Sequence, residues 1–295
     1  MLCLNLKQIL LLMLSLSCAF RARISLSRPS LIRFLSSSFD GGGDKVVSIP
    51  ASNVAACIGA NNFKSPEEVF KELWARYNPK SFATAGEKTK EDMEREAFAA
   101  MDDSLQKALT QTQDASYDKS TIAMQQVANA TSLIKTSTDL DESQKAILSQ
   151  MVKTKVSTKL GTEKEDVVVD AVAEIDGRDY QRDDVLYSIP LCQIDQTTYI
   201  VRGKIDRVVE EDGEVMLVEV KTRMRRLFNE VREYEEIQVQ TYLQMLPDSI
   251  RRAKLIEEFE GETASYIIER DDDKWETVIK PTLIQFAAEL HSVIT

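Results

Sequence analysis

Two kinds of hydrophobic spacing divide the chain beyond residue 44. Up to about residue 160, apolar residues recur every three or four positions, which is the spacing of one face of an α-helix. Beyond residue 166, most apolar residues lie in short runs rich in Val, Ile, Tyr and Thr, which are typical of β-strands. The chain is therefore expected to begin with helices and to continue with a part that contains a sheet.

Two short helices are predicted between residues 49 and 77. The second, at 65–77, has clear start signals, because Ser65 suits the N-cap, Pro66 the first helical position and Glu68 the third position of a capping box. The apolar face of this helix consists of Val69, Phe70, Leu73 and Trp74.

A longer, polar-rich helical stretch follows at 84–155, with a weaker apolar face at 112–140. We interpret 84–155 as an inserted helical layer and as a candidate surface for a protein partner. Residues 166–175 fit a strand or a helix by periodicity alone, and we favour a helix that continues from a turn at Gly161.

The rest of the chain predicts strands followed by helices. Strands are expected at 184–191, 197–210, 214–223 and 263–270, and helices at 228–246 and 280–294. This order indicates an α+β or α/β-type core with a mixed central sheet flanked by helices. Within it, 44–83 would supply the N-terminal helices, 84–155 the insertion and 156–295 the core.

The first 43 residues have a different composition and predict a cleaved targeting presequence and linker. Residues 1–39 hold five basic residues and no acidic one; an apolar run at 9–20 is followed by an Arg- and Ser-rich stretch. This resembles the bipartite leader of proteins bound for plastids of secondary origin, with a mitochondrial presequence as the alternative. The mature protein is expected to have no membrane segment.

Charge and rare residues exclude several functions. Removing residues 1–39 changes the net charge from −11 to −16, so any nucleic-acid binding must come from a local basic patch. The single histidine, His291, cannot form an HExxH zinc site. Cys57 and Cys192 have no CxxC spacing, and no P-loop occurs, so neither an iron–sulfur cluster nor a nucleotide cofactor is expected.

The stretch 203–223 predicts a β-hairpin with charged residues inside it. If the Asp-Gly pair at 212–213 forms a type I′ turn, Asp206 lies opposite Glu219 and Lys204 opposite Lys221, all on one face. Two facing carboxylates repel each other unless a divalent cation lies between them. The alternative is a solvent-exposed sheet face with mixed charges, which antiparallel sheets often have.

Four short motifs follow one another along the chain: Gly161–Glu165 as GxxxE, Gly203–Arg207 as GxxD(R), Glu219–Lys221 as ExK and Gln238–Tyr242 as QxxxY. In this order they resemble the motifs of the PD-(D/E)xK nuclease superfamily, and of its RecB-like and YqaJ, or lambda-exonuclease-like, branch. Residues 56–70 are also similar to the N-terminal helices of YqaJ-like exonucleases. The resemblance implies a restriction-endonuclease-like core, although 84–155 is longer than the family's usual spacer.

The resemblance also implies roles for individual residues. The expected ligands of Mg²⁺ or Mn²⁺ are Glu165 (with Glu163 as the alternate), Asp206, Glu219 and the carbonyl of Val220. Lys221 would position the nucleophile, and Gln238 and Tyr242 would hold Lys221 or a phosphate, so that the catalytic set is Asp206, Glu219, Lys221, Gln238 and Tyr242. The expected phosphate contacts are Lys204, Arg207, Arg223, Arg225 and Arg226.

Two functions follow as hypotheses. The first is a metal-dependent DNA exonuclease, acting on single- or double-stranded DNA in organellar replication, repair or recombination. The second is a DNA-binding or scaffold subunit with a nuclease fold and no catalysis. The intact Asp206, Glu219 and Lys221 positions favour the enzyme.

Overall fold

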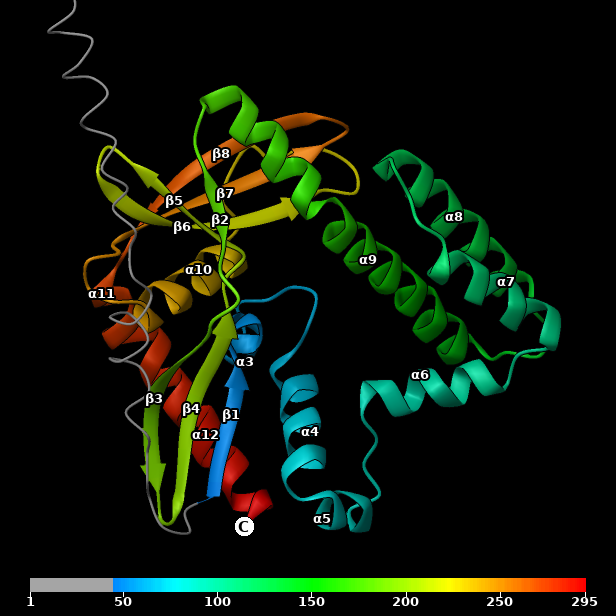
Figure 1. The fold of residues 1–295 in the computed structure, drawn as a ribbon. Helices are drawn as coiled ribbons and strands as arrows, with labels where there is room; N and C mark the ends of the chain where they lie inside the picture. The colour runs from blue at the N-terminus through cyan, green and yellow to red at the C-terminus, as the bar shows by residue number, and fades with distance from the viewer. Residues whose placement is uncertain (1–44) are drawn as a thin grey trace, which may run out of the picture. The chain divides into compact units, whose positions relative to one another are not determined.

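The computed structural model describes residues 45–295, in which the strands form two mixed sheets (Figure 1). The predicted presequence and linker, residues 1–43, lie outside the described residues. In the three-stranded sheet, the order is β1 (Lys45–Pro50), β4 (Thr197–Lys204), β3 (Leu186–Ile194). In the five-stranded sheet, the order is β2 (Tyr180–Arg182), β5 (Arg207–Glu211), β6 (Glu214–Thr222), β7 (Arg252–Phe259), β8 (Glu262–Glu269).

Each sheet contains one parallel pair, β1 with β4 and β6 with β7, and its other pairs are antiparallel. The helix α10 (Glu233–Met245) contacts β3 of one sheet and β7 of the other. The predicted α+β class with mixed sheets flanked by helices is confirmed and is consistent with a restriction-endonuclease-like fold.

The expected single strand at 197–210 is wrong, because the chain leaves one sheet after Lys204 and enters the other at Arg207. The alternation of apolar and polar side chains continues through this break, with Ile205 buried and Asp206 only partly buried, so the pattern could not reveal it. Lys204 therefore pairs with Leu186 of β3 and is not opposite Lys221.

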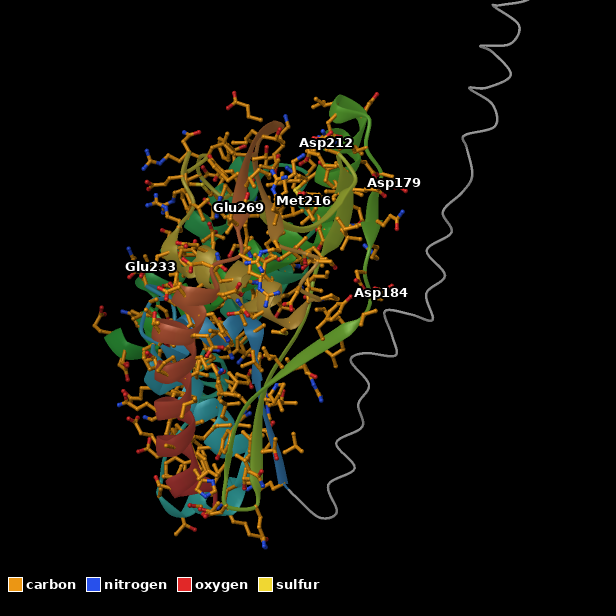
Figure 2. The ribbon with its side chains drawn as sticks, turned by 90° about the vertical axis from the view of Figure 1, so that its left-hand side faces the viewer. Asp179, Asp184, Asp212, Met216, Glu233 and Glu269 are labelled. Atoms are coloured by element: carbon orange, nitrogen blue, oxygen red, sulfur yellow. The ribbon has the colours of Figure 1, made fainter. Side chains whose placement is uncertain are left out.

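The predicted hairpin register is confirmed where both strands exist. Arg207 pairs with Val218 and Glu211 with Glu214. The turn residues Asp212 and Gly213 have φ angles of 54° and 82°, as a type I′ turn requires. Figure 2 shows Asp212 at the tip of this hairpin. Asp206 directly precedes the first paired residue of β5, and continuing the register by one residue sets Asp206 opposite Glu219.

Three strands were not predicted, namely β1, β2 and β7. The most informative is β7, because it lies between β6 and β8 and yet contains Lys254, Glu257 and Glu258, all buried. These charges hide the apolar character of the strand. Each has a charged or polar partner, such as Asp176 for Lys254, and burial is tolerated for that reason.

The N-terminal helices surround one large core. A 3₁₀ turn at Ala51–Asn53 leads to α3 (Val54–Cys57), followed by α4 (Pro66–Tyr77) and α5 (Pro79–Thr84). The capping box of α4 is present, since the Glu68 N–H donates to Ser65 Oγ at 3.2 Å and the Ser65 N–H to Glu68 Oε2 at 2.7 Å. The core also takes residues from α10 and from the C-terminal helix α12 (Lys280–Ile294), which follows α11 (Asp272–Lys274) and a π-helical turn at Trp275–Ile279.

The helical layer has a separate core. Its helices are α6 (Lys90–Ala99), α7 (Asp103–Asp114), α8 (Ser120–Thr136) and the 35-residue α9 (Glu142–Asp176). Residues of α9 such as Leu148 and Val156 pack within the layer, whereas Val168 and Val172 pack on the five-stranded sheet (Figure 1). The predicted helix at 166–175 is confirmed, but the turn at Gly161 is wrong, because α9 continues through it.

This continuous helix runs across the expected boundary between 155 and 156, so the layer and the core share one element. No helix among residues 45–295 is long and apolar enough to cross a membrane.

Candidate active site

The break between β4 and β5 places the Asp206 carboxylate against β6. Asp206 Oδ2 accepts a hydrogen bond from the backbone N–H of Val220 at 3.1 Å. The N–H and C=O groups of one residue in an extended strand face the same neighbour. The carbonyl of Val220 therefore faces the side on which Asp206 lies, and the two can contribute oxygens to one site.

Glu219 and Lys221 project from β6 toward α10, where Gln238 and Tyr242 meet them. Lys221 Nζ donates to Glu219 Oε1 at 2.6 Å and to Gln238 Oε1 at 3.2 Å. Gln238 Nε2 donates to Glu219 Oε1 at 3.1 Å and to the Tyr242 hydroxyl at 3.0 Å. The four residues form one network because Gln238 and Tyr242 are one helical turn apart.

Burial and neighbouring charge shift the pKa values in this network. Burial, together with the nearby charge of Asp206, raises the pKa of Glu219 to about 7, although Lys221 opposes the shift. Burial, together with the charge of Glu165, also raises the pKa of Asp206. For Lys221 burial lowers the pKa, but the adjacent Glu219 outweighs it and the net pKa is raised. The site thus combines two carboxylates whose pKa values are raised with a lysine whose raised pKa keeps it protonated.

Gly203, at the end of β4, has a steric reason to be a glycine. A Cβ atom there would lie 2.7 Å from Ala51 Cβ and 2.8 Å from Tyr242 Cε1. Distances below 3.0 Å are not seen for real Cβ contacts. The glycine of the GxxD motif and the tyrosine of the QxxxY motif are therefore in contact, which explains why both accompany this site.

Helix α9 brings Glu165 near the site through Arg207. Arg207 Nη2 lies 3.8 Å from Glu165 Oε1 and also binds Asp166. The charge of Glu165 is among the causes that raise the pKa of Asp206, after burial. Glu163, the alternate ligand, instead accepts from Ser116 Oγ at 2.6 Å within the helical layer. Of the two glutamates, Glu165 contacts the residue next to Asp206, whereas Glu163 contacts the helical layer.

The donors that converge fit a hard cation. Glu219 Oε2 is buried and has no hydrogen-bond partner in the structure, and it lies beside Asp206. Carboxylate and carbonyl oxygens, with water and substrate phosphate, are what Mg²⁺ takes. Among residues 45–295, no group of three or more His, Cys, Asp or Glu side chains has metal-binding geometry. The candidate cation ligands are therefore the carboxylates of Asp206 and Glu219 and the carbonyl of Val220, while Glu165 lies against Arg207.

The five expected phosphate contacts do not form one patch. Lys204, Arg225 and Arg226 are exposed. Arg207 and Arg223 are buried and paired with carboxylates, which corrects the expectation that they would contact phosphate. Arg223 uses Nε, Nη1 and Nη2 on Glu257 and Glu235, whereas Arg207 binds carboxylates through Nη2 and its buried Nε has no partner in the structure.

The partners of Arg223 were missed by the sequence analysis. Arg223 donates to both oxygens of Glu235, at 2.5 and 3.0 Å, and to Glu257 Oε2 at 2.8 Å. Glu235 lies in the first turn of α10, Glu257 lies in β7 and Arg223 directly follows β6, so the network joins these strands to the helix that carries Gln238. The helix dipole favours an acidic residue in the first turn of a helix, and this was the available sequence signal for a structural role of Glu235.

A third residue of the α10 face was also missed. Tyr234 lies four residues before Gln238, which lies four before Tyr242, so all three share one stripe of the helix. The Tyr234 hydroxyl donates to Glu235 Oε1 at 3.1 Å. The spacing YxxxQxxxY was the signal for it.

Comparison with known proteins identifies the family of the chain. The family described as the PD-(D/E)XK nuclease superfamily matches residues 68–289. No curated protein matches the chain. A solved structure titled "Crystal structure of SSO0001" is similar over 64% of this chain and 85% of that chain, with 16% sequence identity and a TM-score of 0.36. Because the family match covers more than half of the sequence, the chain belongs to the PD-(D/E)XK nuclease superfamily.

Proposed function

We propose that this nuclease is a metal-dependent DNA exonuclease whose site is formed by Asp206, Glu219 and Lys221. The observation that carries the proposal is the buried Oε2 atom of Glu219, which has no partner in the structure and lies beside Asp206. Leaving a buried acceptor unpaired costs stability, and a bound cation would satisfy it. The superfamily supports a nuclease, and the exonuclease activity is our extension of it.

The ion would be Mg²⁺ or Mn²⁺, held by Asp206, Glu219 and the Val220 carbonyl, with Glu165 as a further ligand when it leaves Arg207. When bound, such an ion lowers the pKa of a water molecule and neutralises charge on a phosphate. Lys221 remains protonated and offers its Nζ hydrogens to the attacking water or to a phosphate oxygen. Gln238 fixes the direction of Lys221, and Tyr242 fixes Gln238.

DNA would be held by the exposed basic residues near the site, Lys204, Arg225 and Arg226. A protein with a net charge of −11 repels nucleic acid elsewhere, so binding should be local and sensitive to salt. The composition of residues 1–39 supports a role in organellar DNA replication, repair or recombination, in a plastid of secondary origin or in a mitochondrion.

The test is degradation of end-labelled single- and double-stranded DNA by the purified mature chain. We expect cleavage with Mg²⁺ or Mn²⁺, none with EDTA, and release of nucleotides from an end of the strand. Asp206→Ala and Lys221→Ala should abolish it while circular dichroism and thermal unfolding show a folded protein. Internal cuts would replace the exonuclease by an endonuclease. Binding without any cleavage would favour the alternative, a DNA-binding or scaffold subunit.

A further inference from the structure

Phe63 is a solvent-exposed aromatic residue in the loop between α3 and α4. Its side chain is 62% exposed. The loop is held by local bonds, because the Phe63 N–H donates to Asn61 Oδ1 at 2.8 Å and Lys64 Nζ to Glu72 Oε2 at 2.7 Å. The position of the ring is thus fixed by its own loop, and burial does not explain it.

One edge of this ring is backed by Tyr234. The two ring centroids are 5.6 Å apart and the planes are nearly perpendicular, at 88°. Tyr234 is itself fixed, since its hydroxyl donates to the buried Glu235. An edge contact of this kind leaves most of the Phe63 ring free for another flat group.

The aromatic pair lies next to the proposed catalytic residues. Tyr234 precedes Gln238 by one helical turn, roughly 6 Å along the axis of α10. Burial and the charge of Glu235 raise the pKa of the Tyr234 hydroxyl to about 12, and Lys221 is near enough to oppose the shift. Phe63 therefore contacts the residue that precedes Gln238 on the face of α10 directed to the proposed site.

Positive charge lies in the segment that leads into α10. Arg225 and Arg226 are exposed in the segment that joins β6 to α10. In the same segment, Phe228 lies between the guanidinium groups of Arg223 and Arg232, at 4.1 and 4.4 Å. Aromatic rings beside basic side chains are the usual combination in proteins that bind single strands, where every base offers a flat face.

We propose that Phe63, backed by Tyr234, stacks on an unpaired base beside the phosphate at which the strand is cut. This inference rests on the proposed function and extends it to the substrate, which would be single-stranded DNA or a frayed duplex end. A base inside a duplex has both faces covered by its neighbours and cannot accept the ring. The preference for unpaired bases would therefore be set by Phe63.

The test measures binding and cleavage of a fluorescein-labelled oligothymidylate by Phe63→Leu and Phe63→Trp variants. Binding is followed by fluorescence anisotropy with Ca²⁺ in place of Mg²⁺. Loss of one stacked base predicts roughly 5- to 150-fold weaker binding for Phe63→Leu, and near wild-type binding for Phe63→Trp. KM should rise by a similar factor while kcat stays within twofold. Leu133→Ala, which alters another exposed hydrophobic residue (49% exposed), should change nothing.

A series of strands with one abasic position each locates the stacked base. At one position, removal of the base should weaken wild-type binding and leave Phe63→Leu binding unchanged. The proposal is overturned if Phe63→Leu binds like the wild type, or if every abasic strand affects both proteins equally. These outcomes are separate from the nuclease assay. If DNA is cleaved but no abasic position distinguishes the wild type from Phe63→Leu, only the stacking proposal is wrong. If one abasic position distinguishes them but no DNA is cleaved, only the proposed function is wrong.

Discussion

Two glutamates on neighbouring strands show how differently one fold treats buried negative charge. Glu219 of β6 and Glu257 of β7 are 3% and 0% exposed. Glu257 has partners on both oxygens: Oε1 accepts from the Asn229 N–H and the Tyr266 hydroxyl, and Oε2 from the Phe228 N–H and Arg223. Glu219 has partners on Oε1 alone.

The pKa values follow this difference. Burial raises the pKa of both side chains, but the hydrogen bonds at Glu257 outweigh burial and lower its pKa. At Glu219 burial dominates and raises the pKa to about 7. A buried charge is thus not by itself a sign of function. At Glu219 the unpaired oxygen lies beside a second carboxylate, Asp206, whereas the equally unpaired Oε2 of Glu258 belongs to a carboxylate paired with Lys164.

The largest expected effect separates the two glutamates by activity. Glu219→Gln should lower DNA cleavage by at least about 10³-fold, which corresponds to roughly 4 kcal/mol, since an amide is a poor cation ligand. The free energy of unfolding of this variant at pH 8 should not fall, because the substitution removes a buried negative charge that lies beside Asp206. Single-turnover cleavage and urea unfolding measure both quantities. A variant that keeps activity would contradict the role of Glu219 as a ligand.

The reverse result is expected at the second glutamate. Glu257→Ala leaves the buried Arg223 without one of its two carboxylates, so it should lower the free energy of unfolding by about 3–5 kcal/mol. Where the variant is folded, its cleavage rate should stay within tenfold of the wild type. Urea unfolding monitored by tryptophan fluorescence gives the first value. If a folded Glu257→Ala variant loses more than tenfold in cleavage rate, Glu257 belongs to the catalytic site and the two glutamates do not differ in function.

A pH series tests the cause of the contrast. The carboxyl of Glu219 loses its proton near pH 4.5 in the unfolded chain and near pH 7 in the folded chain. The unfolded state therefore binds fewer protons between these values, and stability should fall as pH rises from about 4.5 to 7, by at most about 3 kcal/mol. Below and above this window the contribution is constant.

The measurement is urea unfolding in EDTA from pH 5 to 8, and the control is Glu219→Gln, in which this slope should disappear. Added Mg²⁺ should stabilise the wild type more at pH 8 than at pH 5, because a cation and a proton compete for the same carboxylate. Equal slopes for the two proteins would show that Glu219 is ionised throughout.

The sequence predicted which side chains of the candidate site lie together better than it predicted the strands around them. Motif spacing and a type I′ turn correctly place Asp206 near Glu219. The burial of Arg223 could not be foreseen, because Glu257 reaches it from β7, and that strand was itself hidden by its charged residues. Local pattern predicts side-chain alternation and turns, whereas ion pairing in the interior depends on which distant strands become neighbours.

A smaller effect is expected from the contact that supports Glu219 through Gln238. Gly203→Ala brings a methyl group against Tyr242 and Ala51 and should lower the free energy of unfolding by about 1–3 kcal/mol. The displaced Tyr242 would loosen Gln238, so kcat should fall with little change in DNA binding. Thermal unfolding and steady-state kinetics measure the two effects. An unchanged kcat would mean that Gln238 holds Glu219 without help from Tyr242.

The smallest effect, with the opposite sign, is expected at Gly161. This residue is inside α9, and a Cβ atom there would have no neighbour within 4 Å. Alanine lowers the entropy of the unfolded chain and favours a helix, so Gly161→Ala should raise the free energy of unfolding by about 0.5–1 kcal/mol without changing cleavage. Urea unfolding and DNA cleavage, measured for Gly161→Ala in parallel with Gly203→Ala, test both expectations. If Gly161→Ala instead lowers cleavage, α9 must bend at this glycine when Glu165 moves from Arg207 toward the site.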